Sequence, residues 1–140
     1  MKIFRFFGKE IILGSLIAIL SVMTALASWQ GSIADSNQNK NETLGMQNLN
    51  DGNAEYLSAN QFMVYDYTLY DSWYTTEDET KAAYFEESYS DELVASIEAN
   101  PDDPFNDNYY DAMYASAYDL WDESDVNFDL ASQYDDLGDE

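Results

Sequence analysis

Residues 11–29 read IILGSLIAILSVMTALASW and contain no charged side chain. Because a helix rises about 1.5 Å per residue, this stretch is long enough to match a hydrocarbon core of about 30 Å. Phe4, Phe6 and Phe7 precede the stretch and Trp29 closes it, as is typical of the two membrane interfaces. We therefore expect residues 11–29 to form a transmembrane helix.

The charged residues are unevenly distributed along the 140-residue chain. Lys2, Arg5 and Lys9 precede the apolar stretch, whereas all but one of the 28 Asp and Glu residues follow it. The positive-inside rule then places the N-terminus in the cytoplasm and the acidic remainder outside. We expect a single-pass protein of the cell membrane, with residues 1–10 as a basic cytoplasmic head.

Two fates are compatible with the apolar stretch. Ala25 and Ala27, followed by Ser28, are similar to a signal-peptidase site, and residues 1–27 have the basic, apolar and small-residue regions of a signal peptide. Small residues at alternating spacings of four and three, a period of 3.5, instead favour a retained anchor, because they let another helix approach closely. This set, here called the membrane stripe, consists of Gly14, Ala18, Ser21, Ala25, Ser28 and Ser32. We expect it to pack against a second copy or against a helix of another membrane protein.

The composition excludes several kinds of function. The chain has no Cys and no His, which rules out disulfide frameworks, thiolate metal sites and imidazole acid–base catalysis. A net charge of −23 argues against nucleic acid as a partner, because phosphate binding needs clustered Lys and Arg. The sequence also holds no glycine-rich phosphate loop, no GxSxG and no HExxH motif. We expect a protein that is not an enzyme and has no catalytic residues, no cofactor and no dedicated metal site.

Residues 30–53 are polar and rich in Asn and Gln, with few large apolar side chains. This stalk or linker is either a solvated continuation of the membrane helix or a flexible tether. We expect a break at residues 51–53, where Gly52 lies between Asp51 and Asn53. Beyond it, residues 54–140 are expected to form an acidic helical domain outside the cytoplasm.

Apolar residues spaced three and four apart predict a helix over residues 54–74. Its apolar face is expected to consist of Leu57, Phe62, Tyr65, Leu69, Tyr70 and Trp73. Asp66 and Asp71 are expected on other faces of the same helix.

Shorter helices are predicted farther along the chain. One covers residues 77–87 and is capped by Thr75 or Thr76, and the next begins at Ser90 or Asp91 and ends before Pro101. After a loop at residues 101–104, we expect a helix over residues 106–121 and a last segment over residues 125–137. Because no run alternates like a strand pair, the fold class is all-α: one N-terminal transmembrane helix followed by a small acidic, aromatic-rich bundle of short helices.

Three groups of side chains suggest ligand binding, and each has a structural alternative. Asp125, Asn127 and Asp129 have the spacing of the first calcium-loop ligands, but Leu130 stands where Gly is required. Four acids surround the proline loop and are interpreted as solvated: Asp102, Asp103, Asp107 and Asp111.

The third group is formed by tyrosines, of which the chain has twelve. They gather in two parts of the sequence: Tyr65, Tyr67, Tyr70, Tyr74 and Tyr84, then Tyr109, Tyr110, Tyr114 and Tyr118. Such a tyrosine face is either a platform for a partner or a glycan, or half-buried packing within a short bundle. We interpret it as packing.

The order of these segments resembles a family of uncharacterised bacterial membrane proteins with an N-terminal membrane helix and a helical extracytoplasmic segment. The matching segments are residues 25–31, 66–73, 82–85, 101–104 and 137–139. Relatives of this kind continue into further membrane helices, which implies that this chain is a shortened member or a fragment. The resemblance brings no activity and no catalytic residue with it.

Together these features predict a membrane-anchored protein with an interaction or structural role. The alternative is a secreted acidic protein, cleaved after Ala27, that binds divalent cations weakly through many carboxylates.

Overall fold

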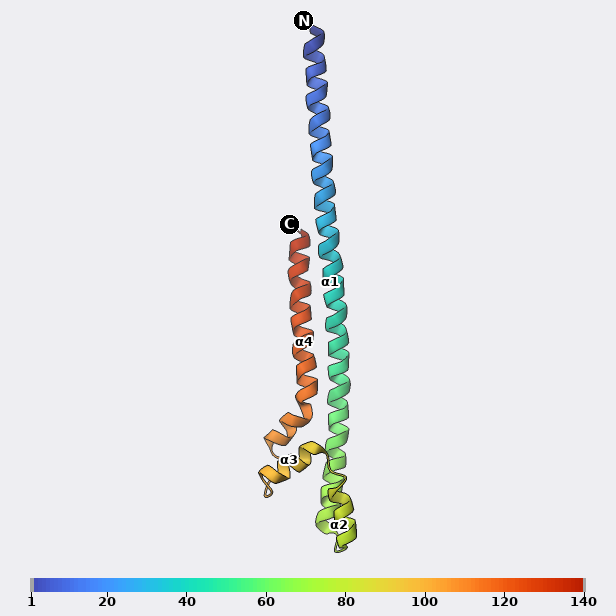
Figure 1. The fold of residues 1–140 in the computed structure, drawn as a ribbon, viewed down its shortest axis with the longest axis vertical. Helices are drawn as coiled ribbons and strands as arrows, with labels where there is room; N and C mark the ends of the chain where they lie inside the picture. The colour runs from blue at the N-terminus through green and yellow to red at the C-terminus, as the bar shows by residue number, and fades with distance from the viewer. Residues whose placement is uncertain (1, 140) are drawn as a thin grey trace. The chain divides into compact units, whose positions relative to one another are not determined.

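In the computed structural model, the backbone of residues 2–139 and the side chains of residues 11–138 are described. All regular secondary structure in that range is helical, which confirms the all-α class (Figure 1). The helices are α1 (Lys2–Thr75), α2 (Glu79–Glu86), α3 (Asp91–Ala99) and α4 (Asp107–Asp139). The chain divides into two compact units. Leu44–Val126 forms one, here called the head unit, and the parts of α1 up to Thr43 and of α4 from Asn127 belong to the other, the anchor unit.

Helix α1 passes through residues 30–53 without interruption. The expected break at residues 51–53 is therefore wrong. Gly52 has no positive φ and is buried, and a Cβ atom there would lie 2.6 Å from Cδ1 of Trp121. This glycine admits a neighbouring side chain to the helix surface instead of turning the chain.

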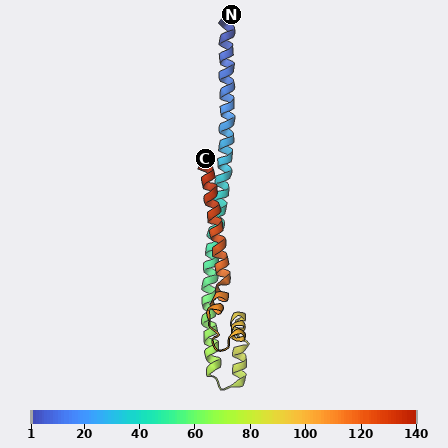
Figure 2. The same ribbon diagram turned by 90° about the vertical axis from the view of Figure 1, so that its left-hand side faces the viewer.

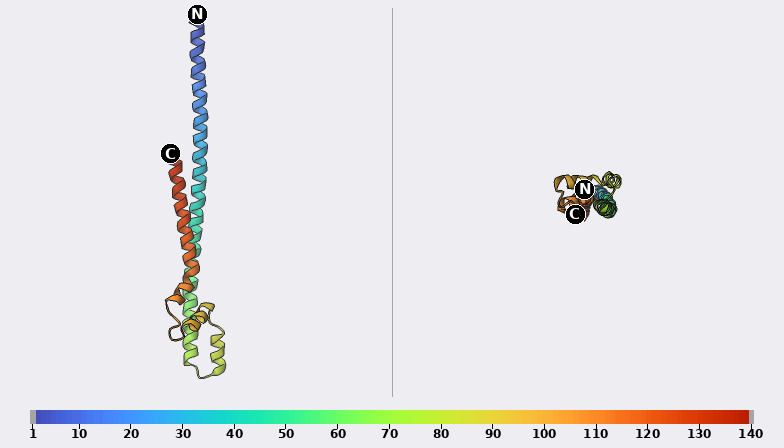
Figure 3. Two further views of the ribbon diagram at one scale, coloured as in Figure 1. Left: turned by 60° about the vertical axis from the view of Figure 1, so that its left-hand side comes forward. Right: turned by 90° about the horizontal axis from the view of Figure 1, so that it is seen from below.

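After α1 the chain reverses direction, so that α2 lies beside the end of α1 (Figure 2, Figure 3). Asp78 caps α2, because its carboxylate accepts hydrogen bonds from the backbone N–H groups of Thr80 and Lys81 at 3.0 and 3.2 Å. The expected caps, Thr75 and Thr76, are wrong. Helix α1 continues through Thr75, and the Thr76 hydroxyl accepts from the Asp78 backbone N–H.

Ser90 caps α3, as predicted, and its hydroxyl accepts a hydrogen bond from the backbone N–H of Leu93 at 3.1 Å. The predicted loop at residues 101–104 is also confirmed, since α3 ends at Ala99 and α4 begins at Asp107. The two segments expected after that loop form one helix, so the expected interruption around residue 123 is wrong.

Within the head unit, α4 runs antiparallel to α1 along small residues (Figure 1). The Ser124 hydroxyl donates a 2.8 Å hydrogen bond to the backbone carbonyl of Gly45. Ala59 and Ala117 are buried, and a Cβ at Gly52 would lie 3.2 Å from the Ala117 carbonyl oxygen. These five residues, here called the small-residue seam, let the two backbones approach closely. Their spacing within each helix is seven residues, which is the repeat of packed helix pairs.

In the anchor unit, the same spacing continues along α4 with Ala131 and Gly138. Ala34 and Ala131 are buried. A Cβ at Gly138 would lie 3.6 Å from the Cβ of Ala34, in ordinary contact. Small side chains therefore also line the α1–α4 contact of this unit.

The core of the head unit is formed by Met63, Leu93 and Tyr109, one residue from each of α1, α3 and α4. Partly buried apolar side chains surround them: Tyr89, Ile97, Phe105, Tyr110, Met113 and Tyr114. The α1 residue of this core, Met63, is not among those expected on the apolar face of α1.

Of the α1 residues expected on the apolar face, Leu69 is buried, but Leu57, Phe62 and Tyr65 are more than half exposed. The prediction is therefore wrong for these three residues. The small-residue seam sets the contact face of α1 at Gly45, Gly52 and Ala59, and the next residue in this repeat is Asp66 rather than an apolar residue. Asp66 was also expected on another face, and that expectation is wrong.

Candidate functional site

Asp66 is the most deeply buried charged side chain among the described residues, with 1% of its surface exposed. Its carboxylate accepts hydrogen bonds from the backbone N–H and the hydroxyl of Ser90, the N-cap of α3. The other hydroxyl donor is Tyr109 of α4, at 2.8 Å. One carboxylate thus joins three helices.

The Ser90 hydroxyl has two roles in this arrangement. It donates to Asp66 and accepts from the Leu93 backbone, so the start of α3 is attached to α1 through a single side chain. A buried carboxylate is costly unless donors surround it, and here three donors do so. We interpret Asp66 as a packing group, since each donor that it meets belongs to the fold itself.

The tyrosines from the two parts of the sequence lie together in the head unit. The hydroxyls of Tyr67 and Tyr110 are hydrogen-bonded to each other, and Tyr114 donates to Asn60 at 2.9 Å. Stacked or tilted rings join Tyr56 with Tyr114 and Trp121 at centroid distances of 4.8 and 5.6 Å. These contacts support the interpretation of most tyrosines as packing.

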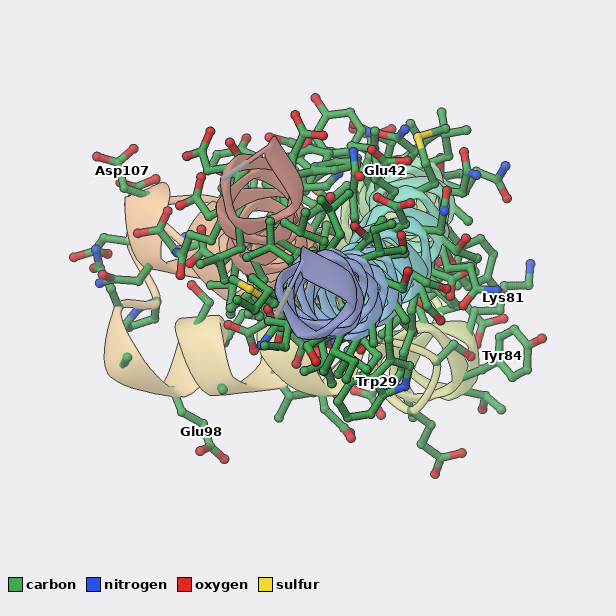
Figure 4. The ribbon with its side chains drawn as sticks, turned by 90° about the horizontal axis from the view of Figure 1, so that it is seen from above. Trp29, Glu42, Lys81, Tyr84, Glu98 and Asp107 are labelled. Atoms are coloured by element: carbon green, nitrogen blue, oxygen red, sulfur yellow. The ribbon has the colours of Figure 1, made fainter. Side chains whose placement is uncertain are left out.

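Tyr65, Tyr74 and Tyr84 are different, because each is at least half exposed. Tyr84 contacts the ring of Phe85 and points outward from α2, as Figure 4 shows. The tyrosines therefore divide into a packed set and an exposed set, which the sequence alone did not separate.

Alkaline pH should destabilise the head unit, because burial disfavours the tyrosinate form. Burial raises the pKa of Tyr89 to about 12, and burial with the hydrogen bond to Asp66 raises the pKa of Tyr109 well above its usual value. In the unfolded chain both tyrosines ionise near a pKa of about 10. Between about pH 10 and pH 12 the folded state therefore binds more protons, and the free energy of unfolding should fall as the pH rises. Thermal unfolding followed by near-UV circular dichroism measures this.

A matched variant is Tyr89→Phe, since the Tyr89 hydroxyl is buried without a hydrogen-bond partner among the described residues. The variant should make the loss of Tm with pH shallower. If the Tm of the parent protein stays constant between about pH 10 and pH 12, the raised pKa values of Tyr89 and Tyr109 are contradicted.

The acidic groups that suggested cation binding do not converge. Asp125, Asn127 and Asp129 lie within about one turn of α4, where residues two apart face different directions. Asp107 and Asp111 lie in the first turns of the same helix and are exposed, as are Asp102 and Asp103 in the loop before it. Over residues 11–138, no group of three or more acidic side chains is placed to hold a metal ion.

All six residues of the membrane stripe lie on α1, and all are exposed in this single chain. Around Gly14 there is open space, since a Cβ there would meet nothing within 4 Å among the described atoms. The stripe is thus free for a partner helix, and its packing stays a prediction.

Sequence reasoning missed Asp66 and the small-residue seam. The seam had a readable signal, because the seven-residue spacing from Gly45 to Ala59 matches the spacing from Ala117 to Gly138. Small-residue periodicity predicts membrane packing in the apolar segment, and the same kind of pattern recurs here in the polar part of the chain. Asp66 continues that repeat, but its residue type gave no indication of burial, since a charged residue is normally solvated.

No protein-family model matches this sequence, and comparison with curated proteins and with solved structures also gives no match.

Proposed function

We propose that the chain is a single-pass protein of the cell membrane that has an interaction or structural role and is not an enzyme. Its N-terminus is cytoplasmic, and residues 54–140 form an acidic, aromatic-rich helical bundle outside the cytoplasm. The membrane is one partner, and a helix that packs on the membrane stripe is another. The resemblance to uncharacterised bacterial membrane proteins is in keeping with this role.

The exposure of the apolar segment carries the proposal. One described helix is long and apolar enough to cross a membrane, and none of its side chains from Ile11 to Trp29 is buried by the described residues. A continuous apolar surface of this kind marks a membrane or protein contact. Lipid is the environment that covers all sides of such a helix at once.

The polar groups within the segment also support lipid as its surroundings. The hydroxyls of Ser21 and Thr24 donate to the backbone carbonyls of Ile17 and Leu20, at 2.8 and 2.9 Å. In hydrocarbon, polar groups must find partners inside the protein, and these hydroxyls have them.

The interaction role is supported by the charge and contacts of the head unit. Lys81 and Asp78 make an exposed ion pair at 3.9 Å. Acidic residues otherwise far outnumber basic residues in this part of the protein, because only two basic residues follow residue 30. Such a surface favours cationic partners and disfavours self-association of the head. Asp66 meanwhile connects α1 with Ser90 at the start of α3 and with Tyr109 of α4.

A cysteine-labelling experiment tests the anchor and its orientation, because the natural chain has no Cys. Glu98→Cys places one thiol on exposed α3, where Figure 4 shows the Glu98 side chain pointing outward. A membrane-impermeant maleimide should label Glu98→Cys in intact cells, whereas Lys2→Cys should react only after lysis. Both proteins should remain full length and stay in the membrane pellet after a carbonate wash. A soluble product that begins at Ser28 would instead establish the secreted alternative.

Association through the membrane stripe makes a further prediction. Replacing Ala18 with Ile should hold two helix backbones apart and weaken the contact, because packing in lipid depends on small side chains. Ile17→Leu, on a different side of the same helix, is the control and should change little. A membrane two-hybrid or crosslinking assay compares the two. If Ala18→Ile associates as well as the parent, the stripe is not a contact surface and the anchor is only a tether.

A further inference from the structure

A cavity of about 390 Å³ lies in the head unit between the last turns of α1 and the loop that joins α3 to α4. Its size is at the small end of the range for ligand pockets. The α1 side of the cavity is formed by residues three and four apart, which share one helix face. Six of the lining residues carry the argument: Tyr67, Tyr70, Asp71, Tyr74, Asp102 and Phe105.

The aromatic rings form walls at right angles. The rings of Tyr67 and Phe105 are stacked, with a centroid distance of 4.0 Å and an angle of 15°. The ring of Tyr70 meets Phe105 edge-on, at 5.4 Å and 89°. The faces of Tyr67 and Phe105 that meet cover each other, so a ligand would contact only the ring surfaces that these contacts leave free, which lie in two perpendicular planes.

Tyr74 stands at the rim of the cavity and is 77% exposed. Among the described residues it has no ring contact and no hydrogen bond, unlike the packed tyrosines. Its ring is therefore available to a ligand. Asp71 and Asp102 are also exposed, and they bring two carboxylates to the lining of the cavity, one from α1 and one from the loop.

We propose that this aromatic cavity binds a quaternary ammonium group, as carried by choline. Ring faces attract a cation through their quadrupole, and the two carboxylates add charge complementarity. The cavity is open to solvent, and a weakly hydrated cation loses little hydration when it contacts aromatic rings there. Anions are disfavoured by the carboxylates, and hard divalent cations need six to eight oxygen ligands, which two carboxylates do not supply. This inference does not depend on the membrane anchor.

The experiment uses the full chain in maltoside micelles, with choline chloride as the probe and sodium chloride to keep the ionic strength constant. Its neutral carbon analogue, dimethylbutanol, has the same shape without the charge. Titration calorimetry or saturation-transfer NMR should show saturable binding of choline, at least about tenfold tighter than that of the analogue. Equal binding of the two compounds, or no saturation by choline, would overturn the proposal.

Two variants locate the site, and each has a matched control outside the cavity. Tyr74→Ala and Asp102→Asn should weaken choline binding about threefold to tenfold. Tyr84→Ala, which removes a similarly exposed tyrosine, and Asp107→Asn, which neutralises another exposed carboxylate, should leave it unchanged (Figure 4). All four positions are exposed, so the fold should be retained, and near-UV circular dichroism checks this. Equal weakening by the control variants would also overturn the proposal, because it would indicate a general charge effect.

A further arm distinguishes the source of the ligand. In nanodiscs of phosphatidylglycerol, the protein is offered either free choline or separate vesicles of phosphatidylcholine. Binding of free choline alone identifies a soluble ligand, whereas retention of vesicles that is released by choline identifies a lipid headgroup. Either result supports a quaternary ammonium site, and retention of vesicles that choline does not release contradicts it.

Discussion

Replacing Asp66 with Ala should lower the free energy of unfolding of the head unit by about 2–4 kcal/mol. The substitution leaves the Ser90 backbone N–H, the Ser90 hydroxyl and the Tyr109 hydroxyl without their common acceptor in a buried position. The loss should exceed the small gain in helix propensity that Ala brings over Asp. Urea unfolding of the full chain in micelles, followed by near-UV circular dichroism, measures the change.

Asp71→Ala is the matched control, because it removes an exposed carboxylate five residues farther along α1. It should leave stability unchanged or raise it slightly through helix propensity. Asp66→Asn keeps the shape of the side chain and one acceptor oxygen. Its loss of stability should therefore lie between those of Asp66→Ala and Asp71→Ala. If Asp66→Ala were as stable as Asp71→Ala, the carboxylate would not be what joins α1 to α3 and α4.

The parts of the fold that the sequence predicted are those governed by local chemistry. The apolar segment predicted a helix, the Ser90 hydroxyl predicted the start of α3, and Pro101 predicted where that helix must end. Each of these signals acts within a few residues and does not depend on what packs nearby. The sequence therefore predicts these three features directly.

The parts that failed depend on contacts between distant segments. Gly52 has the local neighbours of a turn residue, but it lies within α1, and Trp121, far along the chain, packs beside it. Likewise Asp66 reads as a solvated residue until Ser90 and Tyr109 are brought to it. Phe62 is apolar and its spacing predicts a core position, but it is exposed, whereas Ala59 and Asp66 of the seven-residue repeat are buried.

The candidate cavity shows the same division. Tyr67, Tyr70 and Tyr74 share one face of α1 by spacing alone, so the sequence was sufficient to group them. That Phe105 and Asp102 complete this face could not be predicted, because it requires the path of the chain through α2 and α3. Chain reversal, rather than side-chain chemistry, is the missing information.

Because α1 and α4 approach closely at Gly52, replacing this glycine should cost more stability than replacing any other glycine whose surroundings are described. Gly52→Ala should destabilise the head unit by about 1–3 kcal/mol, although Ala normally stabilises a helix relative to Gly. A Cβ at this position would lie 2.6 Å from Cδ1 of Trp121 and 3.2 Å from the carbonyl oxygen of Ala117. Since the second contact is with backbone, the helices must move apart to relieve it. Urea unfolding in micelles measures the loss.

Two controls separate this steric effect from helix propensity. Gly31→Ala introduces the same methyl group on α1 where nothing described lies within 4 Å, and Asn53→Ala changes the exposed neighbour of Gly52. Both should stabilise their helix by up to about 1 kcal/mol. Combining Gly52→Ala with Trp121→Leu removes the ring that the new methyl group would contact, so the double variant should lose less stability than the sum of the two single variants. Strict additivity, or a stable Gly52→Ala protein, would show that α4 does not pack on Gly52, and the small-residue seam would then be wrong.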